Sequence, residues 1–143
     1  MPSRPRPPRR TLLRGAATAP VAGLGLAACA PQDDSTVAAL PTAPVDLGPE
    51  KDIPAGGARL FADDQVVVSR SGDGTCKAFS TICTHRKCVM NDLEATTLTC
   101  VCHGSKFDAT SGKVLHPPAS SPLIELPVRV EKGNVVVGPA DRT

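Results

Sequence analysis

The chain has 143 residues, which gives room for one compact domain and excludes a multidomain enzyme. Its hydrophobic content of 41% is ordinary for a globular protein, but it has three phenylalanines and no Trp or Tyr, so we expect a small aliphatic core. The formal net charge of +2 comes from five arginines in residues 1–14. Without residues 1–28 the net charge is −3, which gives no electrostatic reason to expect nucleic acid.

The first predicted element is an export signal over residues 1–28. The arginines precede an uncharged, Ala-rich stretch at 15–28, too short for a bilayer core of about 30 Å, which needs roughly 20 helical residues. The run from Arg9 to Arg14 resembles a twin-arginine signal, and Leu26-Ala27-Ala28-Cys29 resembles a bacterial lipobox. We therefore expect Cys29 to be acylated and to anchor the chain on the outer face of the bacterial cytoplasmic membrane. The alternatives are a disordered basic arm and a buried structural cysteine.

A Pro-rich stretch follows the signal. Residues 29–50 hold the predicted lipidated cysteine and then mainly Pro, Ala, Asp and Thr, with few large apolar side chains to offset the entropy of ordering. We expect them to form an extended linker that holds the folded domain, residues 51–143, away from the lipid.

The folded domain is predicted to be all-β. Turn residues lie at 71–74 and 131–133. Residues 65–69 before the first turn are rich in β-branched side chains and residues 76–80 after it alternate with period two, which predicts a hairpin, and a second predicted hairpin pairs residues 124–130 with 134–137. No segment keeps apolar residues at helical spacing. Short strands separated by turns predict a small antiparallel sandwich or barrel. The predicted strands are residues 65–69, 76–80, 93–95, 97–100, 105–107, 124–130 and 134–137.

Cysteine and histidine gather in two short segments, Cys83-Thr84-His85-Arg86-Lys87-Cys88 and Cys100-Val101-Cys102-His103-Gly104-Ser105. Thiolates and imidazoles from two separate segments indicate a metal site, with zinc and iron-sulfur as the candidates. A tetrahedral Cys₂His₂ zinc site would leave two cysteines over. If one Cys and one His of each segment ligate, the remaining two cysteines can pair as a disulfide, which an exported protein permits.

The two segments resemble the motifs of the Rieske [2Fe-2S] family, Cys-x-His-x-Gly-Cys and Cys-x-Cys-His-Gly-Ser, and the resemblance extends over roughly residues 51–138. It implies a Rieske-type sandwich with a two-loop cluster-binding subdomain and one [2Fe-2S] cluster, with two Cys on one iron and two His on the other. It also implies a hydroxyl that bonds to the cluster sulfur. Carried over by position, the ligands are Cys83, His85, Cys100 and His103, the hydroxyl is that of Ser105, and the disulfide joins Cys88 to Cys102.

Three positions depart from the family pattern. Lys87 stands where Gly is usual, and Val101 where Pro is common, so the first loop is expected to differ in shape. Phe107 stands where high-potential members have a Tyr, so a lower midpoint potential is expected. The segment His116-Pro117-Pro118-Ala119 resembles the family's proline loop over the cluster, with Gly112 in a turn before it. His116 itself reads as an ordinary polar residue and Cys76 as a buried strand residue.

The resemblance implies one-electron transfer, most like the Rieske subunit of a quinol-oxidising cytochrome bc-type complex, with His103 as the contact for quinol. A free-standing carrier fits nearly as well. The expected partners are a redox protein, quinol and, through Cys29, the membrane. A Rieske oxygenase also needs two His and a carboxylate for its mononuclear iron, whereas this chain has three His and the cluster takes two. The hypothesis from another class is a zinc- or disulfide-stabilised extracytoplasmic binding module without redox activity.

Overall fold

The computed structural model describes residues 40–139 of the chain. The export signal predicted over residues 1–28 and the predicted lipidation site, Cys29, lie outside the described residues. Within the described part of the chain, no helix is long and apolar enough to cross a membrane.

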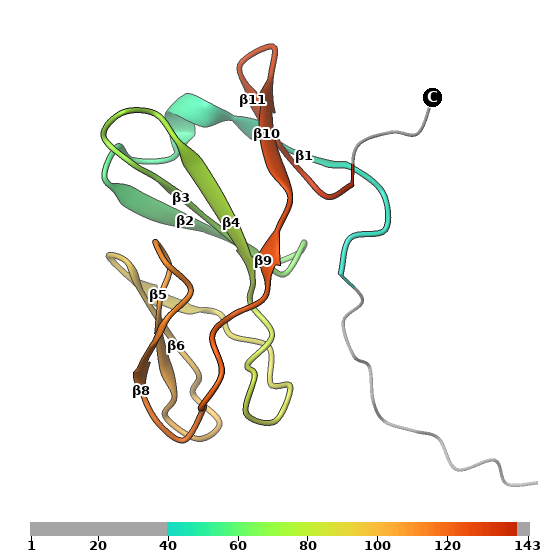
Figure 1. Cartoon of the computed structure of the whole chain (residues 1–143). Coiled ribbons are helices and arrows are strands. Elements are labelled where there is room, and N and C mark those ends of the chain that lie inside the picture. Colours follow the sequence, from blue (N-terminus) through green and yellow to red (C-terminus); the bar gives the residue numbers. More distant parts are fainter. Residues whose placement is uncertain (1–39, 140–143) are drawn as a thin grey trace, which may run out of the picture. The chain divides into compact units, whose positions relative to one another are not determined.

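The described residues form three antiparallel sheets, so the all-β prediction is confirmed (Figure 1). The first sheet has the order β1-β11-β10 and contains β1 (Val45–Pro49), β11 (Asn134–Val137) and β10 (Val128–Glu131). The second has the order β2-β3-β4-β9 and contains β2 (Gly57–Phe61), β3 (Val66–Arg70), β4 (Cys76–Ser80) and β9 (Glu125–Leu126). The third has the order β5-β6-β7-β8 and contains β5 (Asp92–Glu94), β6 (Thr97–Thr99), β7 (Lys106–Asp108) and β8 (Val114–His116).

Strand β3 is buried on both of its faces, which explains its unbroken run of valines. Val66 and Val68 belong to an apolar cluster with Val135 and Val137 of β11, whereas Val67 packs in a second cluster. Successive side chains of a strand point to opposite faces, so the two clusters lie on opposite sides of the second sheet. The cluster that contains Val67 also holds buried side chains of the third sheet and of the two Cys-His segments, and it connects the sheet to the candidate site.

The strand predicted over residues 124–130 is divided in two at Pro127. Its first part, β9, pairs with β4, and its second part, β10, pairs with β11 in a different sheet. Proline has no N–H to donate to a ladder, so a chain can leave one sheet at this residue and enter another. The carbonyl of Pro127 accepts the Gly138 N–H at 2.8 Å.

The folded part begins before the predicted boundary at residue 51. Strand β1 lies within the stretch expected to be linker, and it pairs with β11 through Val45 opposite Val137. A single 3-10 turn, η1 (Glu50–Asp52), follows it. Strands β1, β2 and β8 were not predicted. Pro, Gly and charged residues interrupt the β-branched pattern in β1 and β2, and β8 has only three residues, of which Val114 alone is β-branched.

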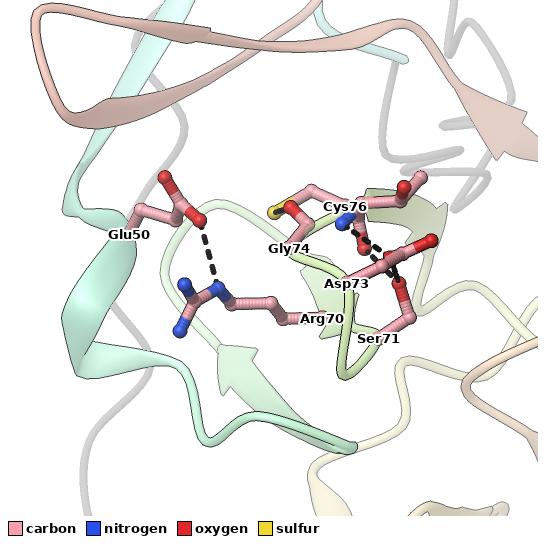
Figure 2. A network of polar contacts seen from close by, with 7 residues as sticks. Glu50, Arg70, Ser71, Asp73, Gly74 and Cys76 are labelled. Carbon is pink, nitrogen blue, oxygen red and sulfur yellow. Dashed lines mark hydrogen bonds and ion pairs between the residues drawn. The ribbon is translucent and has the colours of Figure 1, made fainter.

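A polar network closes the β3-β4 hairpin and ties it to η1 (Figure 2). Arg70 Nε donates to Glu50 Oε1 at 2.7 Å across a half-buried contact. In the turn, the Ser71 hydroxyl bonds to the Asp73 carboxylate, which also accepts the Thr75 N–H at 2.9 Å. The Ser71 hydroxyl, followed by the Thr75 N–H, lowers the pKa of Asp73 to about 2. These contacts stabilise the β3-β4 turn, and the hairpin predicted around residues 71–74 is confirmed.

Candidate metal centre

The first Cys-His segment forms the tip of a hairpin that continues beyond β4. Ile82 and Val89 pair across it as an isolated antiparallel bridge. At the next pair of residues, the Cys83 N–H donates to the Cys88 carbonyl at 2.8 Å. Within the loop, the Lys87 N–H donates to the Cys83 carbonyl at 2.9 Å. The four residues between the two cysteines therefore form a tight, hydrogen-bonded loop that holds His85 at its tip.

The second segment, between β6 and β7, repeats this geometry. The Cys100 N–H donates to the Ser105 carbonyl at 2.8 Å, and the Gly104 N–H donates to the Cys100 carbonyl at 2.8 Å. Gly104 has a φ of 81°, and Lys87, its equivalent in the first loop, has a φ of 61°. Lys87 therefore adopts the left-handed conformation that glycine favours, and the two loops share the same backbone hydrogen-bond pattern.

A disulfide joins the two loops, as predicted. It links Cys88 to Cys102, whose Cα atoms are 6.6 Å apart. In the described part of the chain, the cysteines left free are Cys76, Cys83 and Cys100. Each loop therefore gives one cysteine to the cross-link and keeps one free.

The two free loop cysteines, Cys83 and Cys100, are buried. Cys83 is 1% exposed and Cys100 is fully buried, and both belong to the same apolar cluster as the fully buried Phe107. Burial raises the pKa of the Cys100 thiol, and the neighbouring Cys83 thiol raises it further. The backbone amides of Cys102 and His103 lower this pKa but do not outweigh the burial. A buried thiol with a raised pKa, such as that of Cys100, becomes a thiolate readily only when a metal binds it.

Three sulfur atoms, those of Cys88, Cys100 and Cys102, lie within 4.8 Å of one another. Two of them are bonded to each other in the disulfide, so of the three only Cys100 can offer a thiolate. The cross-link therefore lies directly beside a candidate ligand and shields it.

The two loop histidines contact each other. Their ring centroids are 4.9 Å apart, and the rings stand edge to face at 87°. His103 is exposed, whereas His85 is half-buried and its Nδ1 atom is buried without a hydrogen-bond partner. An unpaired buried nitrogen is costly unless a ligand satisfies it. With two thiols and two imidazoles, the donor set fits a metal cluster that uses nitrogen and sulfur ligands.

A third segment, residues 117–121, is bonded to both loops. The Ser105 hydroxyl is fully buried and accepts the Ala119 N–H at 3.0 Å, which leaves its own proton free to donate toward the site. The Thr84 hydroxyl donates to the Ser121 carbonyl at 2.7 Å. Sequence reasoning missed Thr84, although a hydroxyl between two candidate ligands, Cys83 and His85, could have signalled it.

The remaining histidine and free cysteine of the described residues, His116 and Cys76, lie outside both Cys-His segments. His116 is exposed, and its Nδ1 pairs with the Pro117 carbonyl at 2.7 Å, in agreement with its interpretation as an ordinary polar residue. Cys76 is half-buried at the start of β4 and packs on the other apolar cluster. Burial and the nearby Glu50 carboxylate raise the pKa of its thiol.

Comparison with known proteins agrees with this geometry. Residues 43–129 match the model of the Rieske [2Fe-2S] domain. The chain is 38% identical over 94 residues to the cytochrome b6-f complex iron-sulfur subunit of Chlorobaculum tepidum, covering 64% of this chain and 51% of that protein. It is 37% identical over 84 residues to the cytochrome bc1 complex Rieske iron-sulfur subunit of Corynebacterium glutamicum, covering 53% of this chain and 21% of that subunit.

A solved structure also matches. The cyanobacterial plasma membrane Rieske protein PetC3 from Synechocystis PCC 6803 is 33% identical, with a TM-score of 0.54, and the match covers 66% of this chain and 99% of that one. The chain spans about half the length of the cytochrome b6-f subunits that it matches.

The fold, the disulfide-linked loops and these matches define a class of iron-sulfur electron carriers. The chain belongs to the Rieske [2Fe-2S] domain family, whose members bind a [2Fe-2S] cluster, and it is homologous to the Rieske subunits of cytochrome bc1 and b6-f complexes.

Proposed function

We propose that Cys83, Cys100, His85 and His103 hold one [2Fe-2S] cluster, with the cysteines on the inner iron and the histidines on the outer one. The four side chains support this assignment, since both thiols are buried, the two imidazole rings contact each other, and His103 is exposed. When bound, the cluster supplies a one-electron redox centre. The residues around the cluster determine its exposure to water and its hydrogen bonds.

Each nearby residue has a separate task in this proposal. The buried thiols keep water from the inner iron, and the Cys88–Cys102 disulfide keeps the two loops together when the cluster changes charge. The Ser105 hydroxyl is held by the Ala119 N–H and directs its proton toward the cluster. A hydrogen bond to the cluster stabilises the extra electron and raises the midpoint potential.

Matched substitutions test the ligand set. Cys83→Ser and Cys100→Ser should give colourless protein, whereas Cys76→Ser should keep the visible absorption of the cluster. His85→Ala and His103→Ala should lose the cluster, and His116→Ala should keep it. A cluster that survives in Cys83→Ser, or that is lost in Cys76→Ser, contradicts the assignment.

We further propose that the chain carries electrons from quinol to a c-type cytochrome at the outer face of the bacterial cytoplasmic membrane, as the iron-sulfur subunit of a cytochrome bc-type respiratory chain. The observation that carries this proposal is the exposed imidazole of His103 at the end of the site, where an imidazole nitrogen can accept a hydrogen bond from quinol. The similarity to bc1 and b6-f subunits supports it. A free-standing carrier is the second candidate, because the match to PetC3 covers nearly all of that single chain.

The location is proposed on two grounds. A structural disulfide persists in an oxidising compartment, and Cys88–Cys102 is such a bond. The sequence also predicts a twin-arginine signal and lipidation at Cys29. In this proposal the acyl chains at Cys29 hold the chain at the outer membrane surface.

Deletion and fractionation in the host test these proposals. Deleting the gene should abolish quinol-dependent reduction of c-type cytochrome in membranes, and wild-type chain, but not His103→Ala, should restore it. In spheroplasts, external protease should digest the wild-type chain, and Cys29→Ser should be found in the soluble extracytoplasmic fraction. An unchanged rate after deletion contradicts the role in quinol oxidation, and protection from protease contradicts the location.

A further inference from the structure

The face around the candidate cluster carries exposed positive charge. Arg86 and Lys87 are both exposed in the loop that holds His85, and exposed Lys106 directly follows Ser105 at the end of the other loop. Residues 82–124 contain four Lys and Arg against three Asp and Glu, whereas the rest of the described chain contains six against eight. Positive charge is therefore relatively enriched in the part of the molecule that holds the site.

The cations of this face lack carboxylate partners, in contrast to the arginines elsewhere. Arg59, Arg70 and Arg129 pair with Asp52, Glu50 and Glu131, respectively. Arg86 is the one arginine of residues 40–139 that forms no ion pair, and Lys87 and Lys106 form none within the same residues. Unpaired cations keep their full field and can attract an oppositely charged surface.

The acids of this subdomain do not cancel that field at the loop tips. Asp108 is occupied within its own turn, where it accepts the Thr110 N–H at 2.9 Å and the Ser111 hydroxyl at 2.7 Å. Asp92 and Glu94 lie on β5, an edge strand of the third sheet, outside both ligand loops. The loops themselves contain basic side chains and no acidic ones.

Two large apolar side chains are exposed beside these cations. Val101, within the second loop, is 74% exposed, and Leu115, in the strand opposite Lys106, is 56% exposed. Exposed apolar side chains ringed by charge are typical of a surface that another protein covers. A charged rim around apolar contacts steers a partner and sets its orientation.

We propose that this face docks onto an acidic surface of a redox protein, with Arg86, Lys87 and Lys106 as the charged rim and Val101 and Leu115 in the contact. The inference rests on the proposed electron-transfer function and names the kind of partner for its site. Docking here would bring His103, the exposed ligand, against the partner and shorten the path of the electron.

A single redox protein in two charge forms tests the proposal. The oxidants are native cytochrome c, which is basic, and the same cytochrome after succinylation of its lysines, which is acidic. The reduced full chain is mixed with each in a stopped-flow instrument at ionic strengths from about 10 mM to about 150 mM, over which the Debye length falls from about 30 Å to about 8 Å. The rate with the acidic form should fall about tenfold as salt rises, and the rate with the basic form should rise.

Charge variants locate the effect. Arg86→Gln combined with Lys106→Gln should reduce the salt dependence with the acidic cytochrome to less than half. Lys132→Gln, in the turn between β10 and β11, removes the same kind of charge away from the site and should leave the salt dependence unchanged.

The outcomes separate the two proposals. A salt dependence of the same sign with both cytochromes, or an equal effect of Lys132→Gln, overturns the acidic partner and leaves electron transfer intact. A protein that reduces neither cytochrome at any salt concentration overturns the proposed function as well.

Discussion

Phe107 stands at the position where the family resemblance places a Tyr in high-potential members. The ring is fully buried in the same apolar cluster as the candidate ligands Cys83 and Cys100, and it has no hydroxyl to donate to a ligand sulfur. Adding such a donor should favour the reduced state, because a hydrogen bond weakens the repulsion felt by the incoming electron.

Phe107→Tyr should therefore raise the midpoint potential. A net hydrogen-bond contribution of about 0.5–1.5 kcal/mol corresponds to about 20–60 mV for one electron. A redox titration followed by visible absorption measures the change, and Phe61→Tyr, on the half-buried side of β2, is the matched control. A folded Phe107→Tyr protein with the wild-type midpoint would remove this explanation for a low potential.

The backbone of Lys87 is strained, because it adopts a conformation that only glycine adopts without strain. Its φ of 61° lies in the left-handed region, which costs a non-glycine residue roughly 1–2 kcal/mol. Lys87→Gly should raise the free energy of unfolding by about 1 kcal/mol, since the greater freedom of glycine in the unfolded chain offsets part of the gain. Thermal unfolding compares it with Lys87→Gln, which loses the charge but keeps the strain. Equal stability of the Gly and Gln variants would contradict the argument.

The spacing of the two Cys-His segments predicted a metal site, because each six-residue motif forms one compact loop, and the resemblance to the family assigned the individual ligands. The disulfide was predicted through the family resemblance, and the geometry confirms it. The bond between Thr84 and Ser121 could not be predicted, since the two residues are 37 apart in sequence and meet only once the third segment folds over the loops. Whether the first loop differs in shape from that of other family members stays a prediction.

The turn between β7 and β8 depends on Gly112. Its φ is 74°, and a Cβ added there would lie 2.7 Å from the ring of Phe79, which is buried in β4. The same residue accepts the Leu123 N–H at 2.8 Å, so the turn joins the third sheet to the segment that leads into β9.

Gly112→Ala should lower the free energy of unfolding by about 2–4 kcal/mol, from left-handed strain and overpacking together. Urea unfolding measures the loss. Gly72→Ala, where a Cβ meets nothing within 4 Å, is the control and should change stability little. Recovery of most of the lost stability in Gly112→Ala/Phe79→Leu would identify the ring contact as the main cause, and a near-neutral Gly112→Ala would contradict the packing.

The hydrogen bonds of Asp73 in the β3-β4 turn predict that the stability of the folded state depends on pH. The pKa of Asp73 is lowered to about 2, chiefly by the Ser71 hydroxyl, whereas the pKa of aspartate in an unfolded chain is about 3.9. A folded-state pKa below the unfolded one means that the carboxylate contributes stability above about pH 4 and loses it as the pH falls through about 2. Asp73→Asn should be less stable than wild type at pH 7, and the difference should shrink toward pH 2. Urea unfolding against pH checks this, and a constant difference would contradict it.

Hairpins were predictable because turn residues separate short segments with strand patterns. In β3-β4 a β-branched run precedes the turn and an alternating segment follows it, and in β10-β11 β-branched residues lie on both sides of the turn. Other elements depend on tertiary contacts. Strand β1 carries Gly48 and Pro49 and forms because β11 offers an edge with which to pair. The division at Pro127 could have been anticipated from the missing N–H, but the sheet that each half joins could not, because that depends on the arrangement of the whole domain.

Over the whole molecule, the Cys88–Cys102 bond connects the two ligand loops across a sequence separation of 14. In the loop-entropy account, closing a loop of this size stabilises the folded state by about 3 kcal/mol. The Cys88→Ser/Cys102→Ser variant should lose about that much and should release its cluster faster on heating. Reductant should bring the wild type to the same level and leave the variant unchanged. A variant as stable as wild type would show that the loops hold together without the bond.

The central claim is that the two loops hold a [2Fe-2S] cluster, and spectroscopy on the purified chain tests it most directly. The chain is prepared without strong reductant, its iron and sulfide are counted, and its visible absorption and its EPR spectrum after dithionite reduction are recorded. We predict a brown protein with two irons and two sulfides and the low-average-g signal of a cluster with two histidine ligands. A colourless protein that binds zinc and takes up no cluster on reconstitution would contradict the claim and favour a zinc-stabilised binding module.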